Sequence, residues 1–97
     1  MTEKEARKEL IRRANDLNMT VHVGKDGIDE GLLNEIVNQL KKNRLIKVKV
    51  LSNAEGETSD IAATIVEATG SIMVDVRGGV IVLTDKRTWN SLSQKKF

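Results

Sequence analysis

The sequence predicts a single α+β domain, a two-layer sandwich of a mixed four-stranded sheet with helices mainly on one face. Helical and strand periodicities alternate along the chain in the order α-β-α-β-α-β-β. No linker or internal repeat interrupts that order. The length of 97 residues leaves room for one folded domain, to which we assign residues 1–84.

The first helix and strand follow from a cap and from residue spacing. Thr2 and Glu5 have the spacing of a capping box. The apolar residues that then recur on one helical face predict a helix over residues 3–17: Ala6, Leu10, Ala14 and Leu17, with Ile11 beside them. A strand is expected over residues 19–23, where Met19, Val21 and Val23 alternate with polar residues.

A second helix and a second strand come next. Asp29 can cap a helix that runs to about Lys42, with Asn43 as its left-handed exit. The following segment alternates apolar residues with lysines: Ile46, Lys47, Val48, Lys49 and Val50. Such alternation is typical of a strand with one buried and one polar face.

The last predicted elements are a helix and a hairpin. A helix over residues 57–69 is ended by Gly70. Ile72, Val74 and Val76 alternate with polar residues and should share one face of a strand. Gly78 and Gly79 then form a tight turn into residues 80–83, an apolar strand expected in the centre of the sheet. Residues 85–97 show neither period, so we expect a loosely ordered basic tail.

Composition excludes several function classes. The chain has no cysteine, hence no disulfide, thiolate metal site or cysteine nucleophile. The aromatic residues are Trp89 and Phe97, too few for a stacking platform. His22 is the only histidine, and no carboxylate or second histidine shares its predicted strand face, so a sheet-face histidine is a better interpretation than a ligand or a base. We therefore expect no enzyme activity, metal, cofactor or small-molecule substrate. No apolar run is long enough to span a membrane or form a signal core, so we expect a cytoplasmic protein with no membrane partner.

Charge is segregated along the chain although the net charge is only +2. Residues 54–70 carry acidic side chains and no basic ones, and the segments on both sides are net positive. The sequence thus predicts an acidic third helix on an otherwise basic molecule.

The segment Gly24, Lys25, Asp26 and Gly27 lies between a predicted strand and a predicted helix start. Backbone N–H groups and the positive end of the helix dipole favour phosphate at such a place. Glycines allow a sugar-phosphate backbone to approach closely, and Lys25 adds a mobile charge. The spacing matches neither a P-loop nor a dinucleotide-binding fingerprint, and a plain turn is the alternative. The acids Asp26, Asp29 and Glu30 fit the capping of a helix better than catalysis.

Two further groups of basic residues accompany this loop. Lys47 and Lys49 project from one face of the predicted sheet. Lys41, Lys42 and Arg44 lie at the far end of the second helix, about 20 Å from the loop, so the two groups would contact successive phosphates rather than one. Compensation of the helix dipole is the alternative role of Lys41 and Lys42. Trp89 fits packing at the edge of the domain better than stacking on a base.

Three segments carry a resemblance to a known family: residues 23–28 (VGKDGI), 45–50 (LIKVKV) and 66–70 (VEATG). From about Glu5 to Thr84 the chain resembles the YhbY-like proteins, stand-alone versions of the CRM (chloroplast RNA splicing and ribosome maturation) domain. The resemblance implies RNA binding, an association with large-subunit ribosome precursors, a loop similar to the GxxG loop of KH domains, and a fold similar to the C-terminal domain of translation initiation factor three. Residues 84–97 do not share the family pattern, so the resemblance implies no role for Trp89.

We interpret the sequence as a non-catalytic module that binds ribosomal RNA or its precursors in ribosome assembly or RNA maturation. The predicted RNA-binding residues are Gly24, Lys25, Asp26, Gly27, Lys41, Lys42, Arg44, Lys47 and Lys49. One alternative is an Alba-like chromatin or nucleic-acid binder. Another is a protein-interaction adaptor that uses its acidic third helix.

Overall fold

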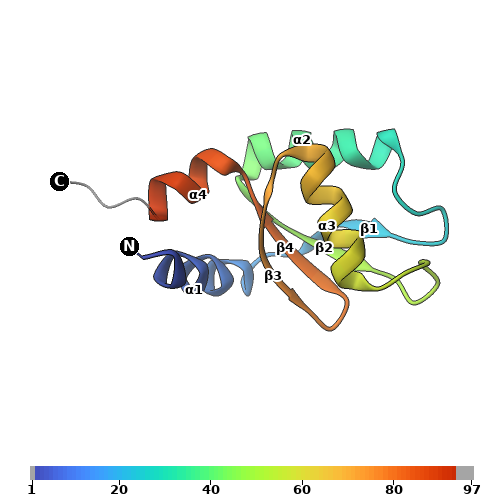
Figure 1. The fold of residues 1–97 in the computed structure, drawn as a ribbon, viewed down its shortest axis with the longest axis horizontal. Coiled ribbons are helices and arrows are strands. Elements are labelled where there is room, and N and C mark those ends of the chain that lie inside the picture. The colour runs from blue at the N-terminus through green and yellow to red at the C-terminus, as the bar shows by residue number, and fades with distance from the viewer. Residues whose placement is uncertain (1, 94–97) are drawn as a thin grey trace.

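Residues 2–93 form four helices and four strands, which alternate except where β3 is followed directly by β4 (Figure 1). The structure is a computed structural model that describes residues 2–93. The elements are α1 (Glu3–Ala14), β1 (Met19–Val23), α2 (Glu30–Asn43), β2 (Leu45–Val50), α3 (Thr58–Thr69), β3 (Ile72–Arg77), β4 (Val80–Thr84) and α4 (Lys86–Ser93). The predicted α+β class and the order of the first seven elements are confirmed. None of the helices within residues 2–93 is long and apolar enough to cross a membrane.

The sheet has the strand order β1-β2-β4-β3. β1 and β2 are parallel, whereas β4 is antiparallel to both of its neighbours, so the sheet is mixed as predicted. The predicted central place of residues 80–83 is also confirmed. Gly78 and Gly79 both have positive φ, 54° and 80°, the conformation of the tight hairpin turn predicted between β3 and β4.

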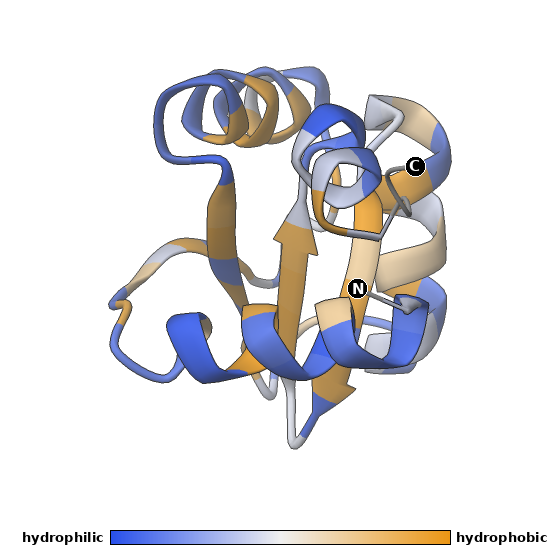
Figure 2. Cartoon of the chain, turned by 90° about the vertical axis from the view of Figure 1, so that its left-hand side faces the viewer, coloured by the Kyte–Doolittle hydropathy of each residue, from blue (hydrophilic) through white to orange (hydrophobic). Residues whose placement is uncertain are grey.

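The larger core lies between one face of the sheet and the helices α2 and α3. Its buried side chains come from every strand except β3: Val21, Val23, Ile46, Val48, Val50, Ile81 and Leu83, packed against Ile36, Leu40, Ile61, Ala62 and Ile65. The strands are the most hydrophobic part of the chain, and the helices turn hydrophilic surfaces outward (Figure 2). Burial of the alternating apolar residues explains why the strand predictions succeed.

A second core on the opposite face corrects the predicted two-layer arrangement. Leu10 and Ala14 of α1 pack there on Leu45, Val74 and Val82, and Trp89 and Leu92 of α4 lie against the same cluster. α1 and α4 contact each other, so together they cover one end of this face. Beyond this cluster the face carries Lys47 and Lys49 of β2 and Val80 of β4.

The helix α4 is the largest departure from prediction. Residues 86–93 were expected to be loosely ordered, but they form two helical turns because Trp89 and Leu92, three residues apart, share an apolar face that packs on the second core. The prediction of a loose tail is therefore wrong for residues 86–93. Residues 94–97 of the predicted tail lie outside the described residues.

Several boundaries also differ from those predicted. The capping box of Thr2 and Glu5 is present, but α1 ends at Ala14, so Leu17 is 36% exposed and does not join the core. The left-handed residue after α2 is Arg44, with φ 66°, rather than Asn43. β3 carries a bulge, since Met73 pairs with Leu83 and Asp75 with Val82.

The bulge changes which side chains face which core. Val74 packs in the second core, while Val76 lies against the first. The expectation that Ile72, Val74 and Val76 share one face is therefore wrong, because an extra residue in one strand reverses the alternation beyond it.

Candidate nucleic-acid interface

The glycine loop forms a tight turn directly after β1. The Gly27 N–H donates to the Gly24 carbonyl at 3.0 Å, which leaves Lys25 and Asp26 exposed at the tip. Gly27 has φ +70°, and a Cβ built on it meets no atom within 4 Å. The backbone on this side of the turn is thus open, and glycine is required by the backbone conformation rather than by lack of space.

The start of α2 is capped by a carboxylate of the chain itself. Asp29 has the predicted capping role, since its carboxylate accepts from the Leu32 N–H at 2.8 Å. Ile28 and Asp29 also separate the loop from the first helical turn. An anion at the loop would therefore depend on the backbone of the turn and on Lys25, because the helix N-terminus already has its own carboxylate.

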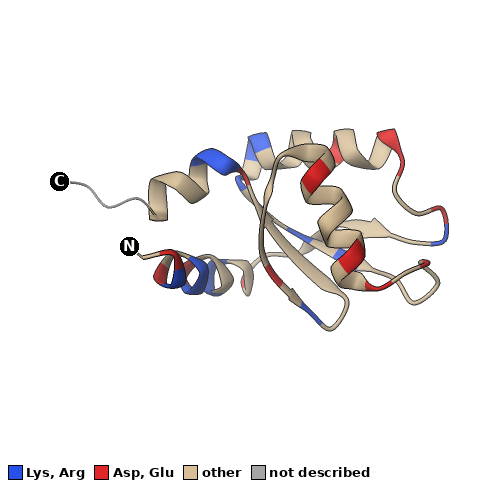
Figure 3. Cartoon of the chain, viewed as in Figure 1, with Lys and Arg blue, Asp and Glu red and all other residues tan. Residues whose placement is uncertain are grey.

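One flank of the loop is acidic. Gly27 and Ile28 line a pocket of about 270 Å³ together with Glu55, Asp60 and other residues that lead into α3. Acidic side chains continue along α3 (Figure 3). A phosphate strand would therefore avoid this flank and approach from the other side of the loop.

The lysines of β2 lie on the sheet face opposite α2 and α3. Lys47 and Lys49 alternate with the buried Val48, and both are partly exposed. The Lys47 ammonium donates to the Leu17 carbonyl at 3.2 Å, and Lys49 lies across from His22 of β1. Because β1 and β2 are parallel and Val23 pairs with Val50, Lys49 and the glycine loop lie at the same end of the sheet.

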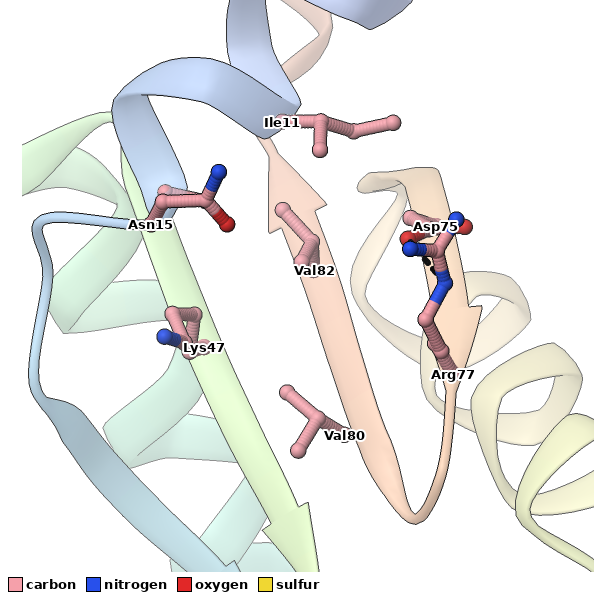
Figure 4. A pocket seen from close by; sticks show the side chains of 8 residues that line it. Ile11, Asn15, Lys47, Asp75, Arg77, Val80 and Val82 are labelled. Atoms are coloured by element: carbon pink, nitrogen blue, oxygen red, sulfur yellow. Dashed lines mark ion pairs between the residues drawn. The ribbon is translucent and has the colours of Figure 1, made fainter.

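A shallow groove continues from Lys47 across the sheet (Figure 4). It has a volume of about 210 Å³, with Val80 and Val82 as its floor and the end of α1 as its wall. Lys47 and Asn15 stand on one side, and the Asp75–Arg77 pair, 3.9 Å apart, stands on the other. Arg77 was not singled out from the sequence, because the bulge in β3 decides where residues 75–77 point.

The remaining predicted residues lie at the other end of the molecule. The end of α2 carries three exposed basic residues, Lys41, Lys42 and Arg44. The fourteen residues of the helix separate this end from the glycine loop. Lys41 lines a depression together with Lys86 of α4, and Arg44 lines another together with Arg87, where the ends of α2 and α4 lie close together (Figure 3). Sequence reasoning missed these two basic residues because the segment was expected to be loose; the net positive charge of residues 71–97 was the available signal.

Other candidates have structural roles. Trp89 packs on the second core as expected. No group of three metal-binding side chains occurs within residues 2–93. Side-chain hydrogen bonds from Arg12 and then Arg13 lower the pKa of Glu9 and keep this carboxylate ionised beside them.

Comparisons with known proteins agree on one family. Residues 1–83 match the CRS1/YhbY (CRM) domain. The Bacillus subtilis "Probable RNA-binding protein YqeI" is 35% identical over 74 residues, 76% of this chain and 77% of that protein. A Haemophilus influenzae "RNA-binding protein" is 42% identical over 71 residues, 72% of this chain and 71% of that protein.

A solved structure and a plant protein extend the comparison. The solution structure of the hypothetical protein SAV1595 from Staphylococcus aureus has a TM-score of 0.73 and 32% identity, covering 89% of this chain and 90% of that one. The chloroplastic CRS2-associated factor 1 of Arabidopsis thaliana is 26% identical over 94 residues, which are 97% of this chain but only 13% of that protein. From the family match over residues 1–83 and the similarity to the two bacterial relatives, the chain belongs to the CRS1/YhbY (CRM) domain family.

Proposed function

We propose that the protein is a non-catalytic, cytoplasmic RNA-binding module that binds ribosomal RNA or its precursors and acts in ribosome assembly or RNA maturation. The observation that carries the proposal is the position of Lys47 and Lys49 on the sheet face opposite α2 and α3. Lys49 also lies at the same end of the sheet as the glycine loop. The bacterial relatives named as RNA-binding proteins support it.

The proposed path for an RNA strand follows β2. Arg44 precedes the strand, Lys47 and Lys49 project from it, and Lys25 lies beyond it on the neighbouring turn. At about 3.3 Å per residue, Arg44 and Lys49 are about 16 Å apart, so they would contact different phosphates of one strand. Such contacts position the backbone and carry little sequence information. Recognition would then depend on RNA shape and on a few polar groups such as Asn15 in the groove.

Salt dependence tests this mechanism before the natural RNA is known. Lys25, Lys47, Lys49 and one of the basic residues at the end of α2 give about four phosphate contacts. Each contributes about −0.7 to the slope of log affinity against log salt on a single strand, so the expected slope is about −3. Lys47→Ala should reduce the magnitude of the slope by about 0.7, whereas Lys8→Ala, an equal charge change on the outer side of α1, should leave it nearly unchanged. A slope near zero would refute the proposal.

Partner choice is tested by retention at one salt concentration. The protein should bind ribosomal RNA fragments and large-subunit precursor particles more tightly than duplex DNA of equal length. Preference for duplex DNA would indicate a chromatin-type binder instead. If Glu57→Gln with Asp60→Asn abolishes association with the particles while RNA affinity is kept, a protein contact on α3 is the main function.

A further inference from the structure

Three arginines from distant parts of the chain meet at the end of the molecule opposite the glycine loop. Arg13 of α1, Arg44 at the end of α2 and Arg87 of α4 line one depression of about 370 Å³, together with Thr88, Ser91 and Leu92. No acidic residue is among its lining residues. A cluster of guanidinium groups beside two hydroxyls has the donors that a phosphate group requires.

The charges of this cluster are available to a ligand. Within residues 2–93, neither Arg44 nor Arg87 forms an ion pair with a carboxylate. Arg13 is held by Glu9, with its Nε 2.7 Å from the carboxylate, and its side chain remains 49% exposed. Arg13 is thus oriented by Glu9, and Arg44 and Arg87 supply the uncompensated positive charge.

The backbone at Arg44 also points to a role for this side chain. Arg44 is the only non-glycine residue of the described chain with positive φ, 66°. The end of α3 has the same geometry, but there the left-handed position is occupied by Gly70, with φ 70°. Glycine adopts this conformation without steric cost, while other residues lose about 1 kcal/mol or more. The stability of the local backbone would favour glycine at position 44, so it does not explain the arginine found there.

Thr88 supplies an independent observation. Its hydroxyl oxygen is buried and has no hydrogen-bond partner among the described residues. The neighbouring Asp85 carboxylate accepts from the Thr88 N–H at 3.4 Å, and its other oxygen is likewise buried without a partner among the described residues. Thr88 also lines the depression, so an oxygen bound there would satisfy this hydroxyl, as a rotation toward Asp85 would; the three arginines therefore carry the site.

We propose that Arg13, Arg44 and Arg87, with Thr88, form a phosphate-binding site that holds a phosphate of the bound RNA at the end of the molecule away from the glycine loop. The site rests on the proposed function for its ligand, and it makes α4 a part of the binding surface. The phosphate belongs either to the interior of the strand or to its 5′ end, since both present the same oxygens to the arginines.

The decisive variant is Arg44→Gly, because it removes the guanidinium and relieves the backbone at the same time. We expect the melting temperature to stay level or rise while RNA affinity falls about tenfold. Arg87→Ala should weaken RNA binding by a similar factor. Arg7→Ala makes an equal change of charge at an exposed position on α1, away from the depression, and should leave RNA affinity unchanged. Wild-type RNA affinity for both Arg44→Gly and Arg87→Ala, with Lys47→Ala still weakened, would overturn this site and leave the proposed function intact.

A measurement without RNA separates the two proposals further. Sodium phosphate, compared with sodium chloride at equal ionic strength, should shift the NMR signals of Arg44, Arg87 and Thr88 but not those of Lys8, an exposed lysine of α1 outside both proposed contact regions. No selective shift at these residues would count against the site even if the protein binds RNA. Comparing RNA with and without a 5′-phosphate then assigns the source of the bound phosphate. If removing the 5′-phosphate weakens binding to the wild type but not to Arg44→Gly, the site holds the 5′ end. If both RNAs bind the wild type equally, the site holds an internal phosphate.

Discussion

The two substitutions Gly27→Asn and Gly27→Asp together measure whether phosphate approaches the glycine loop. Asparagine and aspartate have the same shape, and both tolerate the left-handed conformation that Gly27 adopts at φ +70°. No atom lies within 4 Å of a Cβ at this position, so neither side chain meets a steric clash. We expect each variant to lose about 1 kcal/mol of folding free energy or less, which lowers the melting temperature of a domain this size by about 4–8 °C.

The effect on binding should separate the two variants. A negative charge about 4 Å from a phosphate costs about 1 kcal/mol in bulk water and about 4 kcal/mol in surroundings of lower dielectric. Since the loop is at the surface, we take a value of about 1–2 kcal/mol, which makes the aspartate variant bind RNA about five- to thirtyfold more weakly than the asparagine variant.

Fluorescence anisotropy with a labelled ribosomal RNA fragment, at one fixed salt concentration, measures both affinities. The melting temperatures of the two variants serve as the control. Glu55 and Asp60 lie near Gly27, and their repulsion of an aspartate at position 27 would lower the melting temperature of that variant without any RNA. Equal affinities of two folded variants would refute phosphate approach at this loop.

Three further substitutions test the architecture. Trp89→Ala should remove about 2 kcal/mol of folding free energy, since the ring is partly buried on the second core. Denaturant unfolding followed by circular dichroism measures this loss, and an unchanged unfolding midpoint would mean that the packing of α4 does not stabilise the domain. Thr84→Val removes the hydroxyl that donates to the Arg44 carbonyl at 2.7 Å, and calorimetry should show a loss of about 1–2 kcal/mol; an unchanged melting temperature would mean that this bond contributes nothing. Glu9 has a lowered pKa in the folded protein, so its contribution to stability is complete above pH 4.5 and is lost as the pH falls through the lowered value. Below pH 4.5 the melting temperature of Glu9→Gln should therefore fall less steeply than that of the wild type, and parallel curves would speak against the interactions of Glu9 with Arg12 and Arg13.

Local patterns predict those parts of the fold that depend on neighbouring residues. The alternation of β2, the capping box at Thr2 and the paired glycines at the β3–β4 turn are each encoded within a few residues, and all three are present. The bulge after Met73 and the early end of α1 have no such local signal, since they depend on how α1 packs against the sheet.

The same distinction holds for the candidate site. Lys47 and Lys49 share a face because they are two residues apart on a strand, and this can be predicted from the sequence. The meeting of Arg13, Arg44 and Arg87 cannot be predicted in this way, because it requires α4 to fold onto the second core. The sequence signals for that helix were Asp85 as an N-cap and the spacing of Trp89 and Leu92, and a helix of eight residues is too short for them to outweigh the polar composition around it.

The central place of β4 has a consequence for the order in which the protein can be made and folded. Among the four strands within residues 2–93, β4 is synthesised last, yet it is the one that pairs with both β2 and β3. A nascent chain that has not yet reached residue 80 can pair β1 with β2, but β2 keeps an open edge and β3 has no partner. Open edges of this kind favour pairing between chains. The sheet therefore closes only after β4 has been synthesised, and a chain that stops before residue 80 should aggregate rather than persist as a smaller folded unit.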